Sequence, residues 1–255
     1  MRTGTCNVLL PLMGIASFFL VWWFAGVTWG IDPAVLPGPE DVLHALIGGF
    51  VHGTIIEHIG FTVVATLSGM VVGCSMGFLA GLWVGESVQA NRFLFPIVLG
   101  MQSMPIVAVG PLLIVWFGIG ISSKIALVAI SCFFPLFVST VAGVNSAKPE
   151  LLDLYRVCGA GRLRTLFDVK LPGALHYVFG GLEISVALGL ISCVVAEFIA
   201  SQKGLGYLIK SLSGQLDVSM MFAAIITLAV MGACGAHLVR LAHRYFAGWE
   251  PAQVR

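Results

Sequence analysis

Charged side chains are scarce in this sequence. Lys, Arg, Asp and Glu make up 10% of its 255 residues, whereas soluble domains carry about 25%. Hydrophobic residues account for 58%, and the mean hydropathy is +1.01. A soluble core of this length cannot bury so much apolar surface, and the surplus would aggregate in water. The composition therefore excludes a soluble globular domain and indicates an integral membrane protein.

Several motifs of enzymes and cofactor-binding proteins are also missing. There is no Gly-x-x-x-x-Gly-Lys-Ser/Thr loop, so the chain binds no nucleotide by that route, and there is no His-Glu-x-x-His zinc motif. The six cysteines form no Cys-x-x-Cys pair and are interpreted as small buried hydrophobic residues. His52 and His58 are interpreted as loop residues, because their spacing does not place two metal ligands on one helix face. We expect no metal, no cofactor and no nucleic-acid partner.

Long apolar runs are what the sequence has instead. A helix needs about 20 such residues to cross the bilayer, and continuous runs disfavour a β-barrel, whose strands alternate. The first run could be a signal peptide, but it is longer than a signal core and no clear cleavage site follows it. We predict an all-α polytopic membrane protein with a single domain over 1–255. Its six transmembrane helices are expected at 8–29, 61–85, 93–117, 124–146, 175–199 and 218–241.

The basic residues predict how these helices are oriented. Cytoplasmic loops of membrane proteins are enriched in Lys and Arg. With both termini inside, ten of the 13 basic residues fall on the cytoplasmic side, whereas Lys124, Lys203 and Lys210 fall outside. This orientation places residues 147–173 in the cytoplasm and residues 30–60 outside.

Two patterns predict how helices pack. Residues 40–53 have apolar side chains at helical spacing, so a short helix could lie on the outer interface or pack against the other helices. The span at 61–85 has glycine at every fourth position from Gly69 to Gly85. This strip predicts close approach of another helix.

Residues 147–173 form the one long polar segment of the chain. They hold eight of the 25 charged residues and lie between two apolar spans. Pro149 suits the first turn of a helix, and Gly159 and Gly161 permit a turn. Pro172 is expected to break the helix before the fifth span. The pattern predicts a helical hairpin that is offered to a soluble partner, although an ordinary connecting loop is the alternative.

This hairpin resembles the EAA loop of permease subunits in binding-protein-dependent ABC importers. That loop reads EAA, three residues, Gly, nine residues, Ile-x-Leu-Pro. Asp153 stands at the Glu position, Gly159 at the Gly, Val169 at the Ile, and Leu171 and Pro172 at the Leu-Pro. Two residues depart from the pattern, since Leu154 and Tyr155 replace the alanines.

The resemblance extends over roughly 36–210 and is closest to the sulfonate, taurine and nitrate branch. Residues 105–124 contain a run similar to that branch's PLxxxWFGxG, and 195–208 and 36–42 also resemble it. It implies a type I importer, with a second and often identical permease, a dimer of ATPase subunits that hold ATP and Mg, and a soluble binding protein. The residues implied to couple to the ATPase are Asp153, Leu154, Tyr155, Gly159, Ala160, Gly161, Val169, Leu171 and Pro172.

Two carboxylates, Glu183 and Glu197, lie within the fifth predicted span. Carboxylates inside a membrane are costly and usually face protein or water. At 100° per residue they share a helix face, so they could line a translocation path, or be hydrogen-bonded at a subunit contact. Glu183 stands where many relatives are expected to have Arg. The leading hypothesis is an ABC importer permease of the inner membrane for a small solute, and an ATPase-independent transporter or channel is the alternative.

Overall fold

The computed structural model describes residues 13–14, 17, 20–24, 28, 32 and 35–246. Within these residues the chain is helical and contains no β-strand. The elements from residue 39 onward are α2 (Pro39–Val51), α3 (Thr54–Glu86), α4 (Val88–Gln102), α5 (Ile106–Phe117), α6 (Ile121–Asn145), α7 (Pro149–Val157), α8 (Arg162–Thr165), the π-helical turn η1 (Leu166–Lys170), α9 (Leu171–Ala200), α10 (Leu205–Gln215) and α11 (Val218–Phe246).

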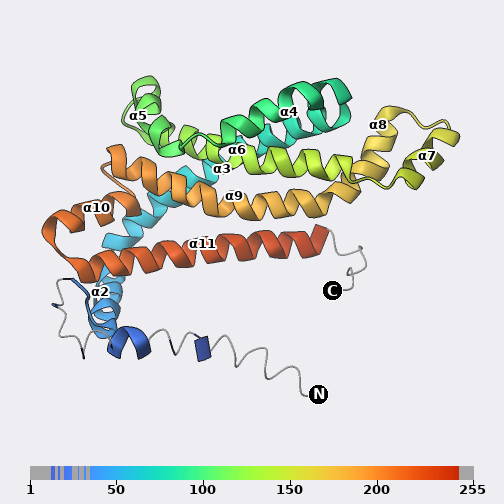
Figure 1. The fold of residues 1–255 in the computed structure, drawn as a ribbon. Helices are drawn as coiled ribbons and strands as arrows, with labels where there is room; N and C mark the ends of the chain where they lie inside the picture. Colours follow the sequence, from blue (N-terminus) through green and yellow to red (C-terminus); the bar gives the residue numbers. More distant parts are fainter. Residues whose placement is uncertain are drawn as a thin grey trace, which may run out of the picture.

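Four long apolar helices form the body of the protein, and α3, α6, α9 and α11 pack in that order (Figure 1). Each is long enough to cross a membrane: Thr54–Glu86, Ile121–Asn145, Arg162–Ala200 and Val218–Phe246. They confirm the spans predicted at 61–85, 124–146, 175–199 and 218–241. Most of the first predicted span, 8–29, lies outside the described residues.

The prediction of one helix over 93–117 was wrong. The structure has two helices there, α4 and α5, which meet at an angle of 94°. Pro105 precedes α5 in an extended conformation, and a residue that precedes proline is disfavoured in the helical region. The break therefore falls at residues 103–105, and the pair together could form a fifth, bent span.

The prediction that Pro172 ends a helix was also wrong. Residues 162–200 form one continuous helical stretch, and Pro172 lies in the first turn of α9. The turn before it is widened to a π-helix, in which the Leu171 N–H donates to the Leu166 carbonyl. A wider turn gives room for a ring that would clash with the carbonyl four residues earlier. The second arm of the hairpin is consequently continuous with the helix that contains the fifth predicted span.

The glycine strip of α3 packs against α6, as its pattern predicts. A Cβ at Gly73 would overlap the Ala129 carbonyl, and one at Gly77 would lie 2.5 Å from the Phe133 carbonyl. The two backbones are therefore in direct contact, which only residues without a side chain allow. This contact fixes α3 beside α6 at the centre of the molecule.

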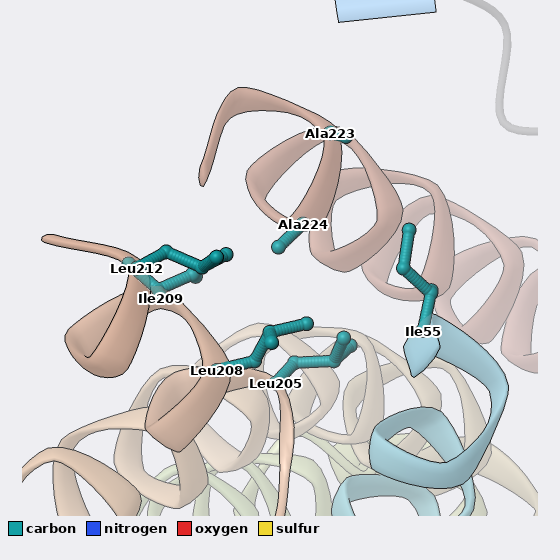
Figure 2. Packing of buried hydrophobic residues seen from close by; sticks show 7 residues of the cluster. All are labelled: Ile55, Leu205, Leu208, Ile209, Leu212, Ala223 and Ala224. Carbon is teal, nitrogen blue, oxygen red and sulfur yellow. The ribbon is translucent and has the colours of Figure 1, made fainter. Parts of the chain in front are cut away.

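An apolar cluster lies at the end of the molecule opposite the hairpin (Figures 1 and 2). Helix α10, which the sequence analysis did not identify, inserts its leucines between the start of α3 and the start of α11. Ala45 and Leu46 of α2 pack on the same cluster, whereas Leu43 and Ile47 are exposed. Helix α2 thus packs against other helices with one face only. The buried members are Ile55, Leu205, Leu208, Ile209, Leu212, Ala223 and Ala224.

Candidate functional site

Helices α7 and α8 project from one end of the bundle as a hairpin (Figure 1). The turn between them is a Schellman motif, in which the Ala160 N–H donates to the Tyr155 carbonyl at 2.9 Å. The Gly159 N–H donates to the Arg156 carbonyl at 3.0 Å. Gly159 has φ +70°, the left-handed conformation that this motif needs and that glycine adopts without strain. Gly161 has φ −70° and begins α8.

The hairpin exposes apolar side chains, although it lies in the most polar part of the sequence. No residue of α7, α8 or η1 is buried. Val157 is 87% exposed and Leu163 is 72% exposed, and contiguous exposed apolar side chains indicate an interaction surface. The sequence analysis missed Val157. We call these residues the hairpin patch: Leu151, Leu154, Val157, Leu163 and Phe167.

Charged residues share the hairpin with the hairpin patch. Asp153 pairs with Arg156 at 3.1 Å, and Arg164 pairs with Asp168 at 3.4 Å, both in exposed positions. Surface pairs of this kind contribute little to stability. The exposed surface of the hairpin thus carries both charged and apolar side chains, as protein–protein interfaces do.

An ion pair holds the base of the hairpin to the body. Lys170 Nζ lies 2.6 Å from Glu86 Oε1, and both side chains are about one-fifth exposed. Glu86 is the last residue of α3, so the pair joins the fifth predicted span to the second. The two residues are 84 positions apart, and the sequence offers no signal that they meet.

The predicted coupling residues all lie on this hairpin or at its base. Asp153, Leu154, Gly159 and Gly161 are exposed. The remaining five are half-buried: Tyr155, Ala160, Val169, Leu171 and Pro172.

Glu197 is fully buried at the opposite end of the molecule. The Thr62 hydroxyl donates to Glu197 Oε1 at 2.8 Å, and the Gly206 N–H donates to Oε2 at 2.7 Å. Thr62 in turn accepts a hydrogen bond from the Leu205 N–H at 2.9 Å. The carboxylate thus bridges α3, α9 and the first turn of α10, and these are the contacts of a hydrogen-bonded structural carboxylate. Its role in a translocation path stays a prediction.

Further contacts tie the turn before α10 to the start of α3. His58 lies in α3, so the expectation that it is a loop residue was wrong, and its Nδ1 accepts a hydrogen bond from the Gly204 N–H at 3.0 Å. Lys203 Nζ lies 2.8 Å from Glu57 Oε1, and the hydrogen bond and charge of Glu57 raise the pKa of Lys203. In the part of the chain that the structure describes, no three His, Cys, Asp or Glu side chains gather as metal ligands.

Glu183 lies on α9 nearer the hairpin and contacts a different helix. Its Oε1 is 3.5 Å from Arg240 Nη1 on α11. Glu183 faces a groove between the two helices, while Glu197 points toward α3 and α10. The structure therefore does not bring the two carboxylates together, and no sequence signal identified Arg240 as a partner.

Comparison with known proteins decides the family. Residues 69–248 match the model of the binding-protein-dependent transport system inner membrane component. The chain belongs to this family of ABC transporter permeases. The riboflavin transport system permease protein RibX of Chloroflexus aurantiacus is 34% identical over 94% of this chain and 91% of its own length. The taurine transport system permease protein TauC of Escherichia coli is 31% identical over 88% of this chain and 84% of its own length.

Solved permease structures share the fold. A chain of the inward-facing MetNI methionine ABC transporter covers 75% of this chain with 94% of its own length, at 19% identity and a TM-score of 0.60. A chain of an amino acid ABC transporter crystallised with histidines covers 77% with 97% of its own, at 16% identity and a TM-score of 0.61. The resemblance and the type I permease fold expected from the sequence are thereby confirmed. The chain is a multi-pass membrane permease of an ABC importer, and these findings do not favour an ATPase-independent transporter.

Proposed function

We propose that this permease works with two ATPase subunits, a second permease copy and a soluble binding protein. In this arrangement ATP and Mg belong to the ATPase subunits, and the permease itself carries no cofactor and hydrolyses nothing. The observation that carries the proposal is the hairpin patch, which is apolar and exposed and shares the hairpin with two exposed ion pairs. Such a surface fits a cleft of a soluble partner.

The hairpin is built to pass movement into the membrane. The Schellman motif at Gly159 fixes the angle between α7 and α8, and α8 continues without a break into the fifth predicted span. The Lys170–Glu86 pair adds a link to α3. Closure of the ATPase dimer would therefore act on two spanning helices together, as a rigid-body switch between inward and outward states. It can bias those states only if it changes the hairpin's contacts.

The proposed orientation places the hairpin and both termini in the cytoplasm, because basic residues concentrate on that side. The binding protein would then dock at the end that carries α2 and α10. The names of the relatives refer to taurine, aliphatic sulfonates and riboflavin, which supports a small anionic or heteroaromatic solute for this chain. Glu183 and Glu197 are proposed to bound its path.

A matched pair of variants tests the coupling role. Val157→Asp places a charge in the hairpin patch without removing a buried contact, since Val157 is 87% exposed. We expect loss of co-purification with the ATPase and loss of ATP-driven uptake in proteoliposomes. The control for ATPase binding is Leu216→Asp at the opposite end, where Leu216 is 74% exposed and its φ of 58° suits Asp. This variant should co-purify with the ATPase as the wild type does. Normal uptake by Val157→Asp, or uptake by the permease without any ATPase, would refute the proposal.

A further inference from the structure

A groove between α9 and α11 lies outside the contacts that form the hairpin and the α10 cluster. It has a volume of about 250 Å³, and its lining includes His176, Phe179, Glu183, Arg240 and His243, together with Gly180 and Val239. It lies in the half of these two helices that is nearer the hairpin (Figure 1). The groove lies between two helices that are long and apolar enough to span a membrane, and charged side chains within such spans are costly and usually functional.

The groove presents one positive and one negative group side by side. Arg240 and Glu183 are 54% and 41% exposed, and the contact between Nη1 and Oε1 is long, at 3.5 Å. A guanidinium has five N–H donors and a carboxylate has two acceptor oxygens, so one long contact leaves most of this capacity open to a ligand. The imidazoles of His176 and His243 lie with ring centres 5.2 Å apart and add ring nitrogens that can form hydrogen bonds.

The groove lining includes one phenylalanine, Phe179, which belongs to a small aromatic stack. The ring of Phe179 stacks on His243 with centres 5.0 Å apart, and on Phe246 at 6.4 Å. An aromatic face attracts both apolar carbon and a cation. The groove therefore combines an anion site, a cation site and an apolar surface within one small volume.

We propose that this groove binds a zwitterion in which a short carbon chain joins an ammonium to an oxyanion. The oxyanion pairs with the guanidinium of Arg240, the ammonium pairs with the carboxylate of Glu183, and the carbon chain contacts Phe179. A simple anion would compete with Glu183 for Arg240 and leave that carboxylate without its partner. A simple cation would do the same to Arg240. A zwitterion pairs with both groups, so its charges are complementary to those of the groove.

Two molecules share this chemistry. One is a free amino sulfonate or amino acid, in which case the inference deepens the proposed import function and rests on it. The other is the headgroup of an ethanolamine phospholipid, whose ammonium and phosphate are also joined by two carbons. Binding is measured without ATP and without transport, so failure here leaves the proposed import function standing.

The solute arm uses the full-length chain, with the subunits that co-purify with it, in a neutral sugar detergent. Taurine, ethanesulfonate and ethylamine are titrated in turn by calorimetry. We expect taurine to bind more tightly than either single-charge probe. Glu183→Gln should weaken taurine by roughly 10- to 100-fold, yet leave ethanesulfonate unchanged or tighter, because Arg240 loses its internal competitor. Arg240→Gln should weaken both, and Arg244→Gln, which does not line the groove, should change neither.

The lipid arm uses nanodiscs of phosphatidylglycerol with or without phosphatidylethanolamine. Native mass spectrometry then counts retained ethanolamine lipid in the wild type and in Glu183→Gln. Retention that Glu183→Gln abolishes, without taurine binding, identifies the headgroup as the ligand. The proposal is overturned if neither taurine nor the ethanolamine lipid binds the wild type, if Glu183→Gln leaves whichever of them binds unchanged, or if it weakens taurine and ethanesulfonate equally.

Discussion

Removal of the Thr62 hydroxyl should release the first turn of α10. In Thr62→Val the Leu205 N–H loses its acceptor and Glu197 Oε1 loses its hydroxyl donor, which leaves that oxygen only the weak Cys193 Sγ contact at 3.6 Å. Thr62 and Glu197 are both fully buried. An unsatisfied buried N–H costs about 1–3 kcal/mol, and a hydrogen bond to a charged group contributes about 1.5–3 kcal/mol. The two losses sum to about 2.5–6 kcal/mol, and we take the central part of this range, about 3–5 kcal/mol, because the long Cys193 Sγ contact compensates little.

Thr62→Ser is the matched control. It keeps the hydroxyl and both hydrogen bonds and removes only a methyl group, which costs about 1 kcal/mol. The two variants should therefore differ by about 2–4 kcal/mol, although valine is closer to threonine in shape. A difference that follows the hydroxyl rather than the shape identifies the hydrogen bonds as its cause.

Hydrogen exchange read by mass spectrometry measures this difference locally. The amides of Leu205 and Gly206 should exchange about 30- to 1,000-fold faster in Thr62→Val than in Thr62→Ser. Peptides from the middle of α6 open only on global unfolding and should stay protected in both variants over the times at which the α10 turn exchanges. Equal protection of the α10 turn in the two variants would show that apolar packing, and not the Glu197 network, holds α10 in place.

Two glycine pairs give further predictions. Gly159→Ala forces a side chain into the left-handed region at a cost of about 1–2 kcal/mol, so protease cleavage in the hairpin should rise and uptake should fall. Gly161→Ala, at negative φ and in open space, should leave the protease cleavage unchanged. Gly73→Ala places a Cβ against the Ala129 carbonyl and should lower the melting temperature in detergent sharply, while Gly60→Ala on the same helix meets nothing within 4 Å and should not. Equal effects within either pair would contradict the reasoning.

Local patterns predicted some of this structure well. Gly159 marks the turn of the hairpin because only residues without a Cβ adopt positive φ freely, and this requirement is a property of the turn itself. The glycine strip of α3 predicted close packing for a similar reason, since an absent side chain always permits approach. Its partner, α6, could not be inferred, because the strip shows that some helix approaches and not which one.

Prolines were predicted less well. Pro172 was expected to end a helix, but the π-helical turn at residues 166–170 gives its ring room. Pro105 was not expected to divide a span, yet the chain bends there by 94°. Proline thus has opposite effects at these two positions. Before Pro172 the helix widens by one residue per turn and continues, whereas at Pro105 the helix ends and the chain changes direction.

The sequence by itself determined that this protein lies in a membrane, where most of its spans fall and which segment forms a turn-linked hairpin. Each of these depends on hydrophobicity or backbone preference within a few turns of helix. Only the tertiary structure decided that Lys170 meets Glu86, that Arg240 meets Glu183 and that Thr62 meets Glu197. These partners are separated by 57 or more positions, and a pairing over that distance depends on which helices pack together. Which helices pack together depends on the apolar faces of all the helices at once, so it cannot be inferred from any one segment of the sequence.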